Sequence, residues 1–287
     1  MSSSSPSLLN RTTDALWGLL DPWLFLATSA SYLPRTIITL LRARRLDVLL
    51  SPRKLQDAWF GAFWDAVSPR MTADDGGGAA TISALLEGRT SAGALVDAPA
   101  HPGIGGVVLE TGPGSGMWVR FLAGRGVERV FGVEPNAESA AKLRRAVEGA
   151  GLADVYTIVP VGVEDLEDGK KWDGRVEKGS VDCIVSVLCL CSIPEPERNI
   201  RELYGYLKKG GRWYVYEHVR CEYSWYMRAY QRFVNLFWPH FIGGCLLCRQ
   251  TGKTLAEAGP WADIDVGQPQ AEPWHKCLPH IMGVYTK

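Results

Sequence analysis

The sequence carries no excess of charge of either sign. Its 287 residues include 31 Lys and Arg and 31 Asp and Glu, so the formal net charge is zero. A protein without net charge has no long-range field that attracts a nucleic acid or an anionic membrane as a whole. We therefore expect no nucleic-acid partner, and any electrostatic recognition must be local.

The cysteines lack the regular spacing of a small disulfide-bonded domain. There are seven, an odd number, and three of them lie in one apolar run. This distribution favours a reducing, cytosol-facing environment. Cys245 and Cys248 form a C-x-x-C pair, but no second pair stands at zinc-ribbon spacing and His240 precedes it without a partner. Most thiols are therefore expected to be buried and apolar, and no metal site is predicted.

The N-terminus lacks the basic start of a secretory signal. Its first ten residues, MSSSSPSLLN, are rich in Ser and are predicted to be disordered. Residues 15–41 are strongly apolar, but Asp21, Pro22 and Pro34 divide them into pieces shorter than the ~20 residues that a spanning helix needs. We expect two short apolar helices that lie in one leaflet, with a helical lid packed on the following domain as the alternative.

A basic run follows the apolar segment directly. Such a run is expected where a chain leaves an apolar layer for an anionic cytoplasmic face. Residues 15–45 are therefore predicted to contact a membrane surface on its cytosolic side, with a cytoplasmic location as the alternative. The basic residues are Arg42, Arg44 and Arg45, and the amphipathic rings suited to such a boundary are Trp17, Trp23 and Tyr32.

Residues 51–71 have the features of an amphipathic helix. Ser51 and Pro52 form a good helix start, and four aromatic residues follow at helical spacing. This helix is expected to cover a pocket or to dock on the core. Residues 72–104 read mostly as linker and loop, with one short helix near Ile82 to Glu87. The chain thus divides into residues 1–50, 51–104 and 105–287.

Strands and helices alternate from residue 105 onward. This order predicts an α/β fold with a parallel sheet covered on both faces. The predicted strands are Gly106 to Glu110, Arg129 to Glu134, Tyr156 to Val161, Val181 to Val187 and Arg212 to Glu217, and the predicted helices are Met117 to Gly124, Ala137 to Ala150 and Glu195 to Leu207.

A glycine-rich loop follows the first of these strands. Gly112, Gly114 and Gly116 let the backbone approach a ligand without Cβ atoms in the way. Dinucleotide-binding proteins use the same device, but their pattern requires a small residue where this chain has Met117. When Glu110 is included, the loop has the form E-x-G-x-G-x-G.

The second strand ends in an acid. Glu134 lies at the carboxyl end of that strand, where open α/β sheets bind ligands, and a carboxylate there can accept two hydrogen bonds from a ribose diol. The spacing from the glycine loop is right for one βαβ unit. The alternative is a solvated turn residue that precedes Pro135.

These motifs together resemble the class I S-adenosylmethionine-dependent methyltransferases, which have a Rossmann-like sheet of about seven mostly parallel strands. The resemblance narrows to the membrane-bound, methyltransferase-like thiol S-methyltransferases over about the last two thirds of the chain. The segments that carry it are Glu217-His218-Val219, GCLLCRQTGKTLAEAG and the terminal PHIMGVYTK. It implies S-methylation of small apolar thiols at the cytosolic face of the endoplasmic reticulum or lipid droplets.

The resemblance also implies roles for individual residues. Glu110 would hold the methionine amino group of S-adenosylmethionine, directly or through water. Val163 and Glu164 would flank the adenine, and the segment from Leu188 to Cys191 would line the cofactor and the methyl-transfer channel.

His218 is the candidate catalytic residue. It follows the fifth strand, near the expected acceptor, where it would take a proton or stabilise a thiolate. The alternative is a structural histidine bonded to the backbone, and His280 is a weaker candidate. The aromatic stretch from Trp225 to Trp238 either walls an apolar acceptor pocket or forms core.

Other functions stay open at this point. One is O- or N-methylation of a small secondary metabolite, and another is a noncatalytic membrane adaptor that keeps the fold. The intact glycine loop and Glu134 disfavour the adaptor, and Met117 disfavours a nicotinamide dehydrogenase.

Overall fold

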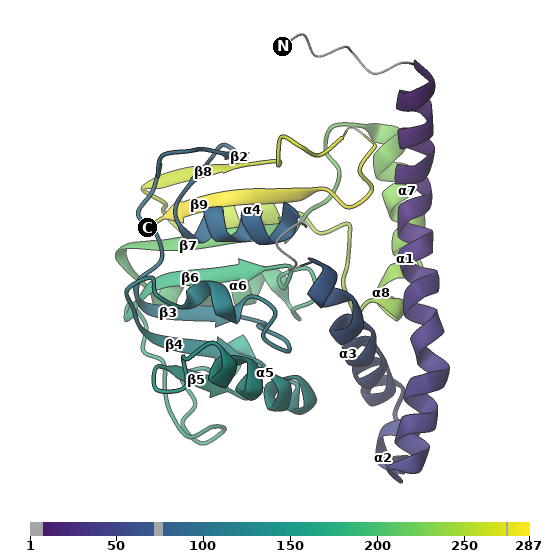
Figure 1. Ribbon diagram of the computed structural model, residues 1–287. Helices are drawn as coiled ribbons and strands as arrows, with labels where there is room; N and C mark the ends of the chain where they lie inside the picture. The colour runs from purple at the N-terminus through teal and green to yellow at the C-terminus, as the bar shows by residue number, and fades with distance from the viewer. Residues whose placement is uncertain (1–7, 72–76, 274) are drawn as a thin grey trace.

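The computed structural model describes residues 8–71, 77–273 and 275–287. A seven-stranded sheet forms its centre, in the order β5-β4-β3-β6-β7-β9-β8 (Figure 1). Strands β3 to β7 run parallel, whereas β9 is antiparallel to both β7 and β8. The bounds are β3 Gly106–Thr111, β4 Val127–Val133, β5 Tyr156–Val159, β6 Val181–Val187, β7 Leu207–His218, β8 Asp263–Gly267 and β9 His280–Thr286.

The strand order reverses between β3 and β6. The chain builds β3, β4 and β5 outward in one direction and then returns to place β6 on the other side of β3. In open parallel sheets, such a reversal leaves a crevice at the carboxyl ends of the strands, where ligands bind. The glycine loop leaves β3 at this point.

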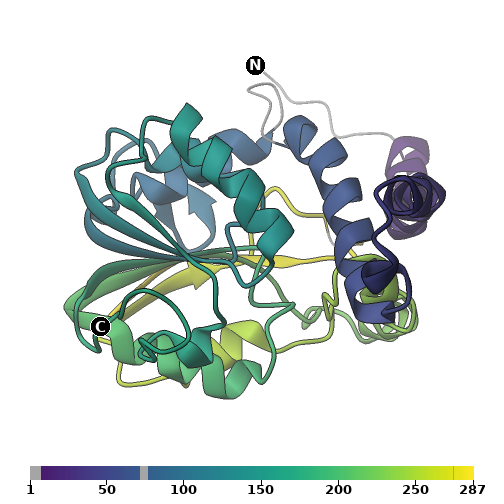
Figure 2. The ribbon, with the colours of Figure 1, turned by 90° about the horizontal axis from the view of Figure 1, so that it is seen from below.

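Helices cover both faces of the sheet, which explains why β6 is mostly apolar, with Asp182 and Ser186 as its polar residues. Figure 2 shows the layers edge-on. On one face, α4 (Gly77–Leu86) and α5 (Ala137–Gly149) pack on the sheet together with the 3-10 turn η1 (Val119–Leu122). On the other face lie α6 (Pro196–Tyr206) and α9 (Thr251–Ala256). All five predicted strands are present, and α5 and α6 match their predictions closely.

The helix predicted from Met117 to Gly124 is wrong. Only the single 3-10 turn η1 forms there, because Gly124 and Gly126 both have positive φ angles that end the helical path. The chain turns quickly and enters β4 at Val127.

The short helix predicted near Ile82 to Glu87 is present but begins earlier, at Gly77, so the interpretation of the residues before it as linker needs correction. Residues 77–86 form α4, and Ile82, Leu85 and Leu86 are buried against the sheet. This apolar face stabilises a helix whose Gly-Gly start has poor helix propensity. A hairpin of β1 (Thr90–Ser91) and β2 (Ala94–Leu95) follows.

The N-terminal segment forms one helix instead of two. Helix α1 runs from Leu8 to Arg42 with Pro22 and Pro34 inside it. Proline removes a helical hydrogen bond, and contacts along one side of α1 offset that loss. Between Thr12 and Arg42 the helix is long and apolar enough to cross a membrane. The disorder predicted for residues 1–10 is wrong for residues 8–10, which belong to α1, and residues 1–7 lie outside the described chain.

Helix α1 belongs to a layer that stands at the carboxyl edge of the sheet (Figure 1). Its partners are α3 (Pro52–Met71), α7 (Trp225–Asn235) and α8 (Trp238–Phe241), with the short α2 (Leu46–Leu49) at the turn. The fully buried Phe63 of α3 lies at the centre, with its ring 5.1 Å from that of Phe25 in α1. This helical layer closes the crevice of the sheet from outside.

Candidate functional site

A cavity of about 790 Å³ lies between the sheet and the helical layer. One side is formed by the loops after β3, β4, β5, β6 and β7. The other side is formed by α1 and α3, and the loop after α8 completes the lining. The predicted site residues Gly112, Gly114, Glu134, Val163, Glu164, Leu188 and His218 all line it.

The glycine loop has the conformation that a close backbone approach requires. Gly112 and Gly114 have φ angles of +58° and +59°, in the left-handed region. A Cβ atom on Gly112 would lie 2.4 Å from the Cys189 Sγ atom, whereas one on Gly114 would meet open space. Gly116 does not line the cavity; a Cβ atom there would lie 2.5 Å from that of Ala146 in α5. Gly116 thus serves packing, and Gly114 leaves its side open for a ligand.

Glu134 connects the end of β4 to the glycine loop. Its Oε2 atom accepts the Gly114 N–H and its Oε1 atom accepts the Asn136 N–H, both at 2.9 Å. The side chain is buried, and burial raises the pKa of its carboxyl group while the two amides lower it. Each carboxylate oxygen keeps a second lone pair, so the group can still accept ribose hydroxyls.

Glu110 does not line the cavity. It is buried, and its Oε2 atom accepts the Tyr156 hydroxyl at 2.6 Å. The ring of Tyr156 reaches across β4 because Gly132 lies between them and has no Cβ atom. Burial raises the pKa of Glu110 to about 7. Its contact with the methionine amino group stays a prediction, and the structure adds a hydrogen bond that ties β3 to β5.

Two further loops meet the same cavity. Val163 and Glu164 lie in the 3-10 turn η2 (Val163–Asp165) after β5, with the Val163 side chain buried. Leu188, directly after β6, has a φ angle of +55°, which costs energy for a residue with a Cβ atom. Its N–H donates to the Tyr216 carbonyl at 2.9 Å, which holds it in this conformation.

Glu217 has a positioning role that the sequence did not reveal. The side chain is fully buried at the end of β7, and its carboxylate accepts the N–H groups of Cys189 and Leu190 at 3.0 and 3.1 Å. Burial raises its pKa to about 7. In the sequence, an acid at the end of a strand has no pattern that distinguishes a role in holding a loop from a role in ligand binding.

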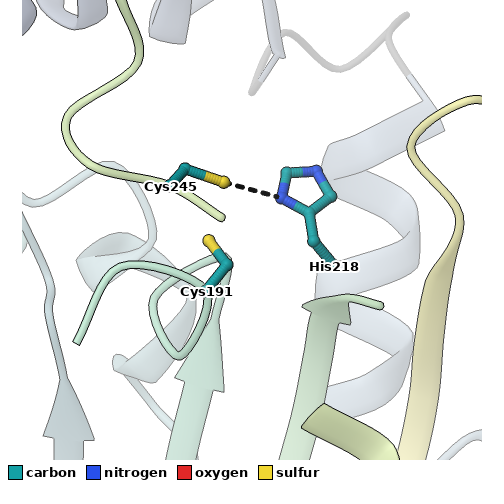
Figure 3. Close-up of side chains that lie close together, drawn as sticks. All are labelled: Cys191, His218 and Cys245. Atoms are coloured by element: carbon teal, nitrogen blue, oxygen red, sulfur yellow. Dashed lines mark hydrogen bonds between the residues drawn. The ribbon is translucent and has the colours of Figure 1, made fainter. Parts of the chain in front are cut away.

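The far end of the cavity is apolar and contains sulfur and imidazole groups. Cys191, His218 and Cys245 converge there from the turn after β6, the end of β7 and the loop after α8 (Figure 3). The ring of His218 lies 4.5 Å from that of His280, which in turn stacks on Tyr216. Burial and the neighbouring His218 lower the pKa of His280 to about 4.

The aromatic stretch from Trp225 to Trp238 contributes to the cavity wall, to the contact with α1 and to the exposed surface. Trp238 is buried and lines the cavity. Tyr230 instead receives a hydrogen bond from Trp23 of α1, whereas Trp225 is 80% exposed. The lining from α1 and α3 was not predicted residue by residue, because these helices reach the cavity only through tertiary packing.

Comparison with known proteins defines the class. Residues 86–258, more than half of the chain, match the methyltransferase domain family, and the chain belongs to it. It is an S-adenosylmethionine-dependent methyltransferase with a Rossmann-like sheet, which confirms the predicted fold, enzyme class and cofactor. A small-molecule acceptor is consistent with this class.

Two curated relatives narrow the family within the methyltransferases. Thiol S-methyltransferases TMT1A and TMT1B of Homo sapiens are 31% and 34% identical to this chain over 182 residues, which cover 63% of the chain and 70% of each relative. The chain therefore belongs to the family of these two proteins, as the resemblance predicted.

A solved structure supports the fold. The [4+2]-cyclase SpnF aligns with a TM-score of 0.52 at 16% identity, over 83% of this chain and 97% of the cyclase. Because a cyclase has this fold, the fold alone does not decide the reaction.

Proposed function

We propose that this protein methylates the sulfur of small apolar thiols at a membrane surface. The observation that carries the proposal is one continuous cavity that joins the cofactor elements to an apolar end containing His218. The names of the two human relatives support a thiol acceptor.

The cofactor end suits S-adenosylmethionine. Glu134 can hold the ribose, the open side of Gly114 admits the methionine portion, and Val163 with Glu164 flanks the adenine. When bound, the cofactor supplies a methyl group on a positively charged sulfur. The leaving thioether needs no acid, so the chain must mainly position the acceptor and exclude water.

The acceptor end suits a thiol better than an alcohol or amine. A thiol has a pKa near 8.5, so a useful fraction is thiolate at neutral pH with modest assistance. His218 is the group that takes the thiol proton or stabilises the thiolate. The walls around it are apolar, with Phe25, Trp64 and Trp238 among the lining residues.

Acceptor choice can be tested on the full chain with radiolabelled S-adenosylmethionine and a matched set of thiophenol, phenol and aniline. We expect transfer to thiophenol to exceed the other two at least about tenfold, because thiophenol is ionised to a larger extent than phenol at neutral pH and a thiolate is a stronger nucleophile than neutral aniline. His218→Gln should reduce this rate, whereas His240→Gln, outside the cavity lining, should not. Preferred methylation of phenol or aniline would assign O- or N-methylation, and cofactor binding without any transfer would indicate a noncatalytic protein.

The proposed membrane contact is the outer side of α1 and α7. Leu16 and Trp17 of α1 are 62% and 60% exposed, and the rings of Trp23 in α1 and Phe233 in α7 lie 5.6 Å apart. The opposite side of α1 packs on protein, where Trp59 donates to the Ser29 carbonyl. A helix bound to protein along one side favours an orientation along the membrane surface over a span.

The cavity and the proposed membrane contact share one helix. Asp21, Pro22 and Phe25 of α1 line the cavity, so an acceptor dissolved in the lipid would reach α1 first. The basic run after α1 would face the anionic cytosolic leaflet. We propose the endoplasmic reticulum or lipid droplets as the location.

Flotation with phospholipid vesicles tests the contact. Replacing Leu16, Leu20 and Leu24 together by Ser should release the protein from vesicles, because each buried side chain of this kind contributes about 1.5–3 kcal/mol. The matched control replaces Leu95 and Ile264, two exposed apolar residues on β2 and β8, away from α1. Equal flotation of both variants and the parent would contradict the proposed surface.

A further inference from the structure

Three metal-ligating groups meet at the acceptor end of the cavity. The Sγ atoms of Cys191 and Cys245 and a ring nitrogen of His218 all lie within 4.8 Å of one another (Figure 3). The distance from Cys245 Sγ to His218 Nδ1 is 3.7 Å. A tetrahedral zinc site, with Zn–S near 2.3 Å and Zn–N near 2.0 Å, places its ligand atoms about 3.5–3.8 Å apart. The cluster needs only small side-chain movements to reach that geometry.

The chemistry of these groups selects the ion and the type of site. Two thiolates and one imidazole suit Zn²⁺, which takes sulfur and nitrogen ligands in tetrahedral arrangement. Structural zinc sites use four protein ligands, whereas catalytic sites use three and leave one position open. Here all three residues line the cavity, so an ion between them would face the acceptor space.

We propose that Cys191, His218 and Cys245 bind a Zn²⁺ ion whose fourth position receives the acceptor thiol. This inference rests on the proposed thiol methylation for the role of the ion, but not for its binding. It replaces the expectation that the cysteines only pack, and it makes His218 a zinc ligand that stabilises the thiolate through the metal.

The ligands are held by a shell of hydrogen bonds from different elements. The carboxylate of Glu217 accepts two N–H groups of the turn that carries Cys191. The Leu246 N–H donates to the Cys191 carbonyl at 3.0 Å, which links the two cysteine-bearing loops. The Arg249 guanidinium donates to the carbonyls of Leu190 and Ile193, both at 2.7 Å. Such outer contacts fix ligand orientation in metal sites.

The charges of the cluster are nearly balanced. Zn²⁺ with two thiolates and a neutral imidazole has no net charge, and a bound acceptor thiolate adds one negative charge. The guanidinium of Arg249, fixed beside the cysteine turn, offsets part of the negative charge of that thiolate and of the Glu217 carboxylate, which binds the same turn.

The methyl transfer would then be a direct displacement at the methyl carbon of the cofactor. The acceptor thiol binds at the open position as a thiolate, and its proton passes to solvent. A sulfur lone pair forms the new S–C bond while the bond from the methyl carbon to the sulfonium breaks, and that electron pair stays on the departing thioether. The neutral methylated product is a weaker ligand than a thiolate, so it leaves the ion.

Metal content tests the site without reference to activity. Full-length protein purified with added zinc should contain one Zn²⁺ per chain. Cys191→Ser and Cys245→Ser should weaken zinc affinity by at least about 100-fold. Cys248→Ser is the matched control, because Cys248 completes the C-x-x-C with Cys245 but lies outside the cluster. Co²⁺ in place of zinc should show thiolate charge-transfer absorption, lost in the first two variants and kept in the third.

Two results would overturn the inference. One is parent protein that binds no zinc, including the case in which mass spectrometry finds a disulfide between Cys191 and Cys245. The other is a Cys245→Ser variant with the zinc content of the parent.

Activity separates this inference from the proposed function. Removing zinc should abolish thiol methylation while calorimetry shows unchanged binding of S-adenosylmethionine at the other end of the cavity. Thiol methylation that persists without zinc would refute the role of the ion in methyl transfer and leave the proposed function standing. Zinc binding with methylation of phenol alone would support the site and refute the thiol acceptor.

Discussion

Replacing Glu134 by Ala is expected to remove cofactor binding while the domain stays folded. The carboxylate is 7% exposed and holds the Gly114 and Asn136 amides at 2.9 Å. We expect it to bond both ribose hydroxyls as well. Hydrogen bonds to a charged group contribute about 1.5–3 kcal/mol each, so the loss of two costs at least about 3 kcal/mol. This corresponds to a rise in Kd of roughly 150-fold or more.

Isothermal titration with S-adenosylmethionine measures this effect. Glu128→Ala is the control, because Glu128 lies at the opposite, exposed end of the same strand. Far-ultraviolet circular dichroism should show that both variants keep their secondary structure. An unchanged Kd for Glu134→Ala would refute the ribose assignment, and unfolding of this variant would show that Glu134 is mainly structural.

Three further outcomes are expected. Gly116→Ala should lower the free energy of unfolding by about 1–3 kcal/mol in denaturant titrations, because its Cβ atom would collide with Ala146. Gly114→Ala should lower the free energy of unfolding less than Gly116→Ala but weaken cofactor binding. Equal losses of stability in the two variants would contradict the assignment of Gly116 to packing and of Gly114 to the ligand side. Burial raises the pKa of Glu217 from 4.5 to about 7. Between these two pH values the folded chain keeps a proton on Glu217 that the unfolded chain has lost. The free energy of unfolding therefore falls as the pH rises from 4.5 to about 7. Glu217→Gln should make the free energy of unfolding depend less on pH in this range. Unfolding curves of this variant that keep the pH dependence of the parent would refute the assignment to Glu217. Phe63→Ala should speed hydrogen exchange in α1 and α3 but not in the sheet, because its buried ring joins these helices; uniform exchange would refute a separate helical layer.

The alternating pattern of the catalytic region was readable from the sequence. A strand covered on both faces is mostly apolar, as five of the seven residues of β6 are, and this made its ends predictable. The glycine loop and Glu134 were readable for a similar reason. Close backbone approach requires glycine, and a strand-end acid needs no distant partner to be placed at the carboxyl edge of the sheet.

Local signals failed where distant contacts decide the structure. Pro22 and Pro34 indicated breaks, yet α1 continues through both because α3, α7 and α8 support one side of it. The Gly-Gly start of α4 indicated a loop, yet Ile82 buries against the sheet and stabilises a helix.

The acceptor end of the cavity was decided by tertiary structure alone. Cys191 and Cys245 come from two separate loops and His218 from the end of β7, and Cys245 and His218 are 27 residues apart in the chain. The one short-range pattern, C-x-x-C, joined Cys245 to Cys248, which the fold does not place in the cluster. Side chains from separate strand ends meet only because parallel strands bring their carboxyl ends to one edge. The backbone pattern therefore predicted that edge, but only the packed loops show which side chains face one another across it.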